Sequence, residues 1–328
     1  MNKTLKSIII SAAMFAASAS LFGASKKSIV CTTFPEYDWV MNILGEKAGS
    51  FDVTLLQNNG TDLHSYQPSV KDIAKISNAD LFVYVGGESD EWVEKVVSQS
   101  VNKKQIVVNM LEVLGDKVRE EEIVEGMQAE EENEHEHHHH HGEDEDEEEV
   151  EYDEHVWLSL NNAIDLTNVL CAEISKIDGG NASVYLKNAE AYTKQLAALD
   201  AEFKATVKSA KKSTVLFGDR FPFRYLTDDY DLNYYAAFLG CSAESEASFE
   251  TIIFLANKID ELGLNAVLTI EKSDTKIAKT VVNSTKNKNQ QILEMDSLQS
   301  ITTKEIIGGR NYLSAMKKNL EVLKKALN

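Results

Sequence analysis

Residues 182–212 read ASVYLKNAEAYTKQLAALDAEFKATVKSAKK, a stretch without proline or glycine. Apolar side chains recur there at intervals of three and four, which is the spacing of one face of an α-helix. These positions are Tyr185, Ala189, Tyr192, Leu196, Leu199, Phe203 and Val207. At ~1.5 Å per residue, about thirty residues reach roughly 45 Å. The pattern predicts one long helix that joins two halves of the chain, and two shorter helices with a bend are the alternative.

Short apolar runs lie on both sides of this helix, separated by segments with helical spacing such as 249–262. This alternation indicates βα units and parallel sheets. We therefore predict an α/β fold of two lobes, each a mainly parallel four-stranded sheet flanked by helices, joined by one long rigid helix. The N-terminal lobe is expected over 25–180, the connecting helix over 181–212 and the C-terminal lobe over 213–328. The expected strands are 29–33, 53–57, 81–85 and 106–109, then 215–217, 233–238, 266–270 and 292–295.

The first two dozen residues have the composition of an export signal. Lys3 and Lys6 precede an apolar run over 8–22, and small residues follow it. Such a sequence is typical of a secretory signal peptide, which we place at 1–24. A membrane anchor is the alternative, although the run is short for a spanning helix. We expect an exported protein, periplasmic or at the cell surface.

The net charge of −20 is concentrated in one insert at 119–152. Nineteen of the 53 acidic residues lie within 120–154, which leaves 34 acidic residues against 33 basic ones elsewhere. A nearly neutral body without clustered Lys and Arg does not indicate nucleic-acid binding. The insert is low in complexity and cannot bury apolar surface, so we predict a disordered loop.

Histidines mark two further features of the chain. Six of the eight lie in the acidic insert, where they can bind metal ions weakly, with a merely solvated charge run as the alternative. These six are His135, His137, His138, His139, His140 and His141. His64 lies in GTDLHSYQPS (60–69), after the second expected strand, and His155 lies in DEHVWLS (153–159). Ligands of α/β proteins gather at the carboxyl ends of strands, although an isolated histidine can also be a satisfied polar residue.

These two histidine segments resemble motifs of a known family. GTDLHSYQPS resembles the G-x-D-P-H-x-Y-x-P-S signature of the zinc- and manganese-binding solute-binding proteins of bacterial ABC importers, and DEHVWLS resembles their D-P-H-V-W-L-S motif. Thr-Thr-Phe-Pro at 32–35 and Glu91-Trp92 agree as well. The resemblance covers the whole mature chain in order. It implies one divalent ion bound in a cleft between the lobes and passed to a membrane permease.

The resemblance also implies a set of ligands. It assigns His64 and His155 to the N-terminal lobe and Asp296 to the family's fourth ligand. The third ligand follows the first strand of the second lobe in a pattern like F-H-D-A-F, where this chain has FGDRF at 217–221. Gly218 falls at the ligand position and offers no side chain, so Asp219 is the next candidate. Further alternatives are Glu244, Glu246, Glu271 and a Cys241 thiolate.

Two motif prolines are replaced, by Leu63 and Glu154. We expect these changes to alter the stiffness of the loops rather than the chemistry of the ligands.

Two imidazoles with one or two carboxylates suit zinc, and manganese or iron is the alternative. A hydrolase is not indicated, because the chain lacks H-E-x-x-H and G-x-S-x-G motifs. The expected function is therefore a non-enzymatic, monomeric zinc-binding protein of an importer. An exported metal buffer or adhesin, and an exported zinc hydrolase, are the competing functions.

Overall fold

The computed structural model describes residues 26–128, 151–242 and 246–328. The expected signal peptide at 1–24 and the six histidines of the acidic insert lie outside these residues. The described residues form two four-stranded sheets, of order β2-β1-β3-β4 and β6-β5-β7-β8. Every pair of neighbouring strands is parallel. The predicted fold class is confirmed.

All the predicted strands are present, with small differences at their ends. The first sheet consists of β1 (Lys27–Cys31), β2 (Phe51–Leu55), β3 (Leu81–Tyr84) and β4 (Ile106–Asn109). The second consists of β5 (Thr214–Phe221), β6 (Asn233–Leu239), β7 (Ala266–Ile270) and β8 (Gln291–Met295).

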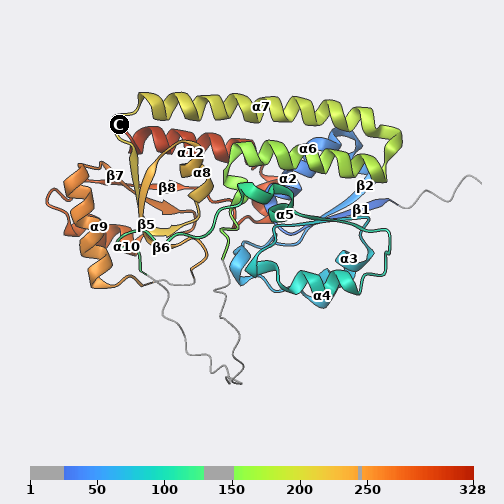
Figure 1. Cartoon of the computed structure of the whole chain (residues 1–328), viewed down its shortest axis with the longest axis horizontal. Helices are drawn as coiled ribbons and strands as arrows, with labels where there is room; N and C mark the ends of the chain where they lie inside the picture. The colour runs from blue at the N-terminus through green and yellow to red at the C-terminus, as the bar shows by residue number, and fades with distance from the viewer. Residues whose placement is uncertain (1–25, 129–150, 243–245) are drawn as a thin grey trace, which may run out of the picture.

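The α-helices cover both faces of each sheet (Figure 1). The first lobe contains α2 (Phe34–Leu44), α3 (Val70–Asn78), α4 (Trp92–Ser98), α5 (Met110–Leu114) and α6 (Leu160–Ile177). The second contains α8 (Arg224–Asp229), α9 (Phe249–Leu262), α10 (Lys276–Ser284), α11 (Thr303–Ile307) and α12 (Tyr312–Ala326). Among the residues that the structure describes, none of the helices is both long and apolar enough to span a bilayer.

The long helix α7 (Ala182–Ser209) runs unbroken along both lobes (Figure 1). It ends three residues before the predicted end, because Ala210 is extended. Six of the seven predicted apolar positions are buried, and Val207 is partly buried. They pack on α2, α6 and α12, and the resulting core is continuous from one lobe to the other. A bend between two shorter helices is not observed.

Trp157 joins the two lobes at the centre of this core. Its side chain is fully buried, and its indole N–H donates to the carbonyl of Ser297 at 2.8 Å. The hydroxyl of Tyr312, on α12, donates back to the Trp157 carbonyl at 2.6 Å. Because buried polar groups are costly to leave unpaired, these two bonds fix how the segment around Trp157 sits on the second lobe.

The beginning of the acidic insert, which we predicted to be part of a disordered loop, packs on the second lobe. The Gln128 N–H donates to the carbonyl of Ala237 on the edge strand β6 at 2.9 Å. Glu122 pairs with Arg224, and a bridge between Glu120 and Tyr152 closes the base of the insert. The described part of the insert therefore runs from its base at Glu120 to β6 at Gln128.

Truncation of α7 tests the continuous core. Leu196 is fully buried, so Leu196→Ala should lower the free energy of unfolding by about 2–5 kcal/mol through lost burial and a new cavity. The exposed Lys194 supplies the control, and Lys194→Ala should change it by less than about 0.5 kcal/mol. Urea titration followed by circular dichroism measures both. Equal effects of the two substitutions would show that α7 is not part of the core.

Candidate metal centre

His64 is carried by a short 3₁₀ turn, Leu63–Ser65, that follows β2. Asp62 begins this turn, and its carboxylate accepts the His64 backbone N–H at 3.2 Å. The loop before it is tied to the second lobe, since Gly60 N–H donates to the Ile301 carbonyl at 3.1 Å. The His64 side chain is 13% exposed. The turn therefore holds the imidazole between the lobes with one edge open to solvent.

His155 lies directly before the 3₁₀ turn Val156–Leu158 and is fully buried. The Asp153 carboxylate accepts both the His155 backbone N–H at 2.8 Å and its ring Nδ1–H at 2.9 Å. The Tyr225 hydroxyl donates to the Asp153 carbonyl at 2.8 Å. With Nδ1 held toward Asp153, Nε2 is the ring nitrogen that faces His64.

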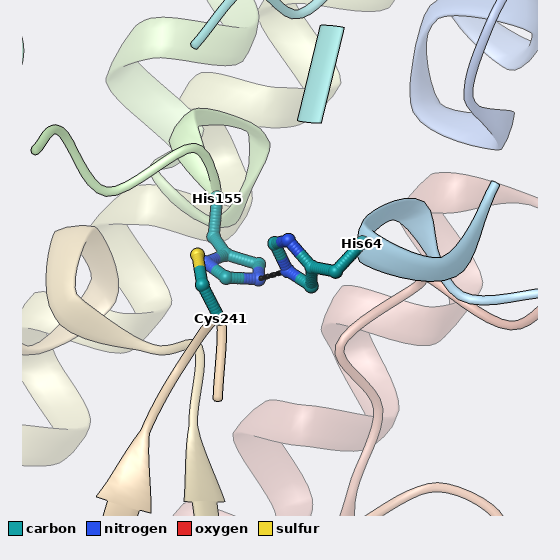
Figure 2. A group of neighbouring side chains, drawn as sticks. All are labelled: His64, His155 and Cys241. Atoms are coloured by element: carbon teal, nitrogen blue, oxygen red, sulfur yellow. Dashed lines mark hydrogen bonds between the residues drawn. The ribbon is translucent and has the colours of Figure 1, made fainter. Parts of the chain in front are cut away.

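The two imidazoles meet between the lobes, and the thiol of Cys241 lies beside them (Figure 2). The Nε2 atoms of His64 and His155 are 3.3 Å apart. Cys241 follows β6, and its Sγ lies within 4.8 Å of one nitrogen of each imidazole. Within the described ranges, this is the group of three or more His, Cys, Asp or Glu side chains that could hold a metal ion. It draws ligands from three separate segments of the chain.

The two imidazoles have opposite protonation tendencies. Burial, together with the charge of His155, lowers the pKa of His64 to about 3. Burial also acts against the charged form of His155, but Asp153 outweighs it and raises the pKa of His155 above its usual 6.5. A metal ion must therefore displace a proton from His155, and affinity should fall as pH drops below that pKa.

The Cys241 thiol is protonated at neutral pH in the metal-free protein. Burial raises its pKa well above the ordinary value, and the charges of Glu121, Asp153 and Glu154 add to the effect. A bound cation would reverse this balance, because a coordinated thiol is deprotonated by the charge of the metal.

Arg220 and Gln299 form the rest of the wall contributed by the second lobe. The guanidinium of Arg220 pairs with Asp62 at 2.7 Å across the cleft. With the Gln299 amide oriented to match donors with acceptors, its nitrogen donates to both Asp62 oxygens at 3.0 Å and its oxygen accepts from His155 Nε2 at 2.7 Å. Asp62 thus links the His64 turn to two side chains of the opposite lobe.

Gly218 and Asp219 do not reach the imidazoles. A Cβ on Gly218 would lie 2.7 Å from the Ala278 backbone of α10, so this position faces away from the cleft. Burial raises the pKa of Asp219, and a hydrogen bond from Ser273 opposes the rise, which places its carboxylate near the loop after β7. A register shift in β5 between Phe217 and Arg220 brings Arg220, rather than Gly218, to the cleft.

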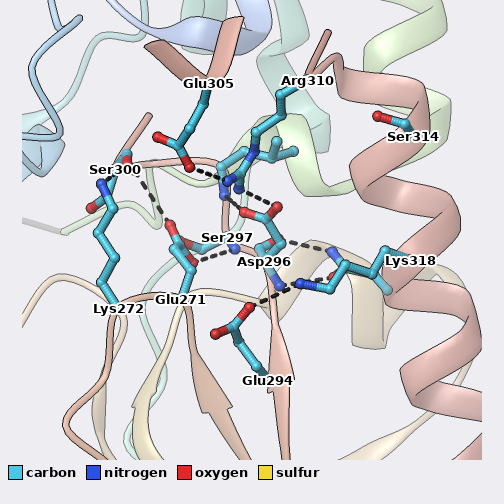
Figure 3. Close-up of polar contacts among 12 residues, drawn as sticks. Glu271, Lys272, Glu294, Asp296, Ser297, Ser300, Glu305, Arg310, Ser314 and Lys318 are labelled. Carbon is cyan, nitrogen blue, oxygen red and sulfur yellow. Dashed lines mark hydrogen bonds and ion pairs between the residues drawn. The ribbon is translucent and has the colours of Figure 1, made fainter. Parts of the chain in front are cut away.

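The Asp296 carboxylate is paired with residues other than the two histidines (Figure 3). Its carboxylate pairs with Arg310 and accepts the Leu298 N–H at 3.0 Å. Nearby, Glu271 accepts the N–H of Ser297 at 2.7 Å. Both carboxylates thereby shape the loop after β8 that presents Gln299. The structure does not place Asp296 in the group formed by His64, His155 and Cys241.

Several residues of the site were not identified from the sequence as its main components. Cys241 was considered only as an alternative, and Arg220 and Gln299 were not considered. Glu154 was expected to affect loop stiffness, but its carboxylate is buried and lies 3.6 Å from His64 Nδ1. An acidic residue directly before a predicted histidine ligand was the available signal for Glu154.

Comparison with known proteins places this site in a family context. The model of the ZnuA family, described as zinc-uptake complex component A periplasmic, matches residues 29–326. The chain is 30% identical over 302 residues to the high-affinity zinc uptake system protein ZnuA of Bacillus subtilis (strain 168), covering 92% of this chain and 88% of that protein.

A second similarity is to longer proteins. The chain is 29% identical over 303 residues to the zinc-binding protein AdcA of Streptococcus pyogenes serotype M3, covering 91% of this chain but 56% of AdcA, so it spans little more than half the length of that relative. Among solved structures, the Zn(II)-bound ZnuA-like domain of Streptococcus pneumoniae AdcA matches with a TM-score of 0.69 and 27% identity, covering 92% of this chain and 99% of that domain.

The opposite pKa shifts of the imidazoles can be measured directly. In metal-free protein, the ring resonances of His64 should not titrate between pH 8 and 5, whereas His155 should titrate with a pKa above 6.5. NMR titration measures both, and His64→Asn and His155→Asn identify the signals. Two titrations near 6.5 would contradict this description of the site.

Proposed function

The chain belongs to the ZnuA family of periplasmic zinc-uptake components, and we propose that it captures a zinc ion between its two lobes and delivers it to the membrane permease of an ABC-type importer. The proposed ligands are the Nε2 atoms of His64 and His155 and the Sγ of Cys241. Asp219 and Asp296, which the resemblance suggested, are not included in this set because the group that could hold a metal ion does not contain them.

The distance between the two Nε2 atoms is the main support for this proposal. Zinc lies 2.0–2.1 Å from imidazole nitrogen and prefers tetrahedral angles, so two histidine ligands of one ion are about 3.3 Å apart. The two nitrogens are 3.3 Å apart in the structure. Each ring also has its Nδ1 next to an acceptor, Asp153 for His155 and Ser89 for His64. Such outer partners direct Nε2 toward a metal.

Cys241 supports zinc over manganese. Thiolate and imidazole ligands suit zinc, whereas manganese prefers carboxylate, carbonyl and water oxygen. A sulfur and a nitrogen of one tetrahedral zinc are about 3.6 Å apart, and the Cys241 Sγ already lies within 4.8 Å of one nitrogen of each imidazole. A small movement of the segment after β6 would complete a three-ligand set. Gln299 or water is then available for the fourth position.

The remaining parts of the proposal concern delivery. We infer that the protein is an exported, monomeric binding protein without catalytic activity. Transport requires release as well as capture. The partly buried guanidinium of Arg220 lies close enough to disfavour a charge on His64, and its positive charge also opposes very tight binding of a metal ion. The acidic, histidine-rich insert would raise the local concentration of cations. Its residue Gln128 packs on β6, and its residue Glu121 lies beside Cys241.

A competitive zinc titration tests the proposed ligands. His64→Ala and His155→Ala should each weaken the tight site by more than the roughly 10–100-fold that loss of an outer partner costs. Cys241→Ser should weaken it as well, while Cys171→Ser, a buried cysteine outside the site, should not. Replacing the six insert histidines with serine should leave one tight site.

Two results would overturn the proposal. One is tight zinc binding that survives His64→Ala. The other is complete loss of tight binding when only the insert histidines are replaced, which would indicate a metal buffer whose site is the insert.

A further inference from the structure

The carboxylate of Glu154 is buried against the loop that follows β3. Its side chain is almost fully buried, at 2% exposed. Oε1 accepts the backbone N–H of Ser89 at 2.8 Å. The loop after β3 makes room through Gly87, because a Cβ on that residue would lie 2.5 Å from Oε1. A buried carboxyl group in a fitted position indicates a role beyond the stiffness of its loop.

The second oxygen of Glu154 faces His64. Oε2 is buried, has no hydrogen-bond partner among the described residues, and lies 3.6 Å from His64 Nδ1. The hydroxyl of Ser89 lies 2.8 Å from the same ring nitrogen. A buried carboxylate oxygen without a partner costs free energy. This cost is smaller when the nitrogen that faces the oxygen carries a hydrogen.

We infer that Glu154 is a positioning residue that holds His64 in the tautomer protonated at Nδ1, so that Nε2 is free to bind zinc. An ionised carboxylate can only accept hydrogen bonds. It therefore favours the ring form with the proton on the facing nitrogen and the lone pair on the far one. Glu154 does not touch the metal. The inference rests on the proposed function only in taking His64 Nε2 as a zinc ligand.

Asp153, the residue before Glu154, orients the ring of His155 in the same way. Asp153 accepts the Nδ1–H of His155 at 2.9 Å, so two adjacent carboxylates serve the two rings. The chain turns between them, and each points to a different histidine. A carboxylate behind a ligating histidine also increases the basicity of the ring, which strengthens its bond to a metal.

The test uses the full chain with Glu154→Gln. Its amide can still accept from the Ser89 N–H, but its NH₂ group then faces His64 Nδ1, which disfavours a proton there. Zinc affinity should fall about 10–100-fold. Long-range ¹⁵N–¹H NMR of the metal-free protein at pH 8 should show His64 shifting toward the Nε2–H form, with His155 unchanged. Glu91→Gln, an exposed acid of the same loop, should alter neither property.

A second variant covers the case in which Glu154→Gln does not fold. In Ser89→Ala, Glu154 remains as the acceptor, so His64 should keep its Nδ1–H form. Loss of that form in Ser89→Ala, or wild-type tautomer and affinity in Glu154→Gln, would overturn the inference. Failure of the proposed function would look different, because His64→Ala would then bind zinc normally while the tautomer of His64 still responded to Glu154.

Discussion

The indole of Trp157 joins the two lobes directly beside the candidate metal centre. Its N–H bonds to the Ser297 carbonyl, and the Tyr312 hydroxyl bonds to its own carbonyl. His155 is two residues before it, and Gln299 is two residues after Ser297. These two buried hydrogen bonds therefore fix the position of His155 in the first lobe and of the loop that carries Gln299 in the second. The geometry of the site depends on these contacts of Trp157 more than on either sheet.

The contacts between the lobes also limit how far the lobes can move apart. The core is continuous beneath α7, and the loop before His64 pairs with residues 301–303 of the second lobe. A wide hinge opening would break all of these contacts at once. Small movements of loops could capture and release a metal ion without breaking these contacts. The segments that carry His64 and Cys241 are the less buried parts of the site. This agrees with the predicted rigid connection between the lobes.

Much of the fold could be predicted because its signals are local. The spacing of Tyr185, Leu196 and Phe203 is sufficient to indicate α7, and short apolar runs gave all the strands. His64 and His155 could be identified because each lies in a distinctive motif. The family's ligand position after β5 is occupied by Gly218, and a register shift in β5 places Arg220 rather than Gly218 beside Asp62 of the first lobe, which the sequence does not reveal. The proximity of Cys241 depends on where β6 ends in space, which no pattern in the sequence reports.

The central claim is that zinc binds to two imidazoles and one thiolate in the cleft. Zinc X-ray absorption of the full chain loaded with less than one equivalent of metal tests it most directly, because sulfur and nitrogen differ in distance and in scattering. The expected result is one sulfur at about 2.3 Å with nitrogen or oxygen at about 2.0–2.1 Å, and loss of the sulfur in Cys241→Ser. A shell of nitrogen and oxygen alone would contradict the assignment of Cys241.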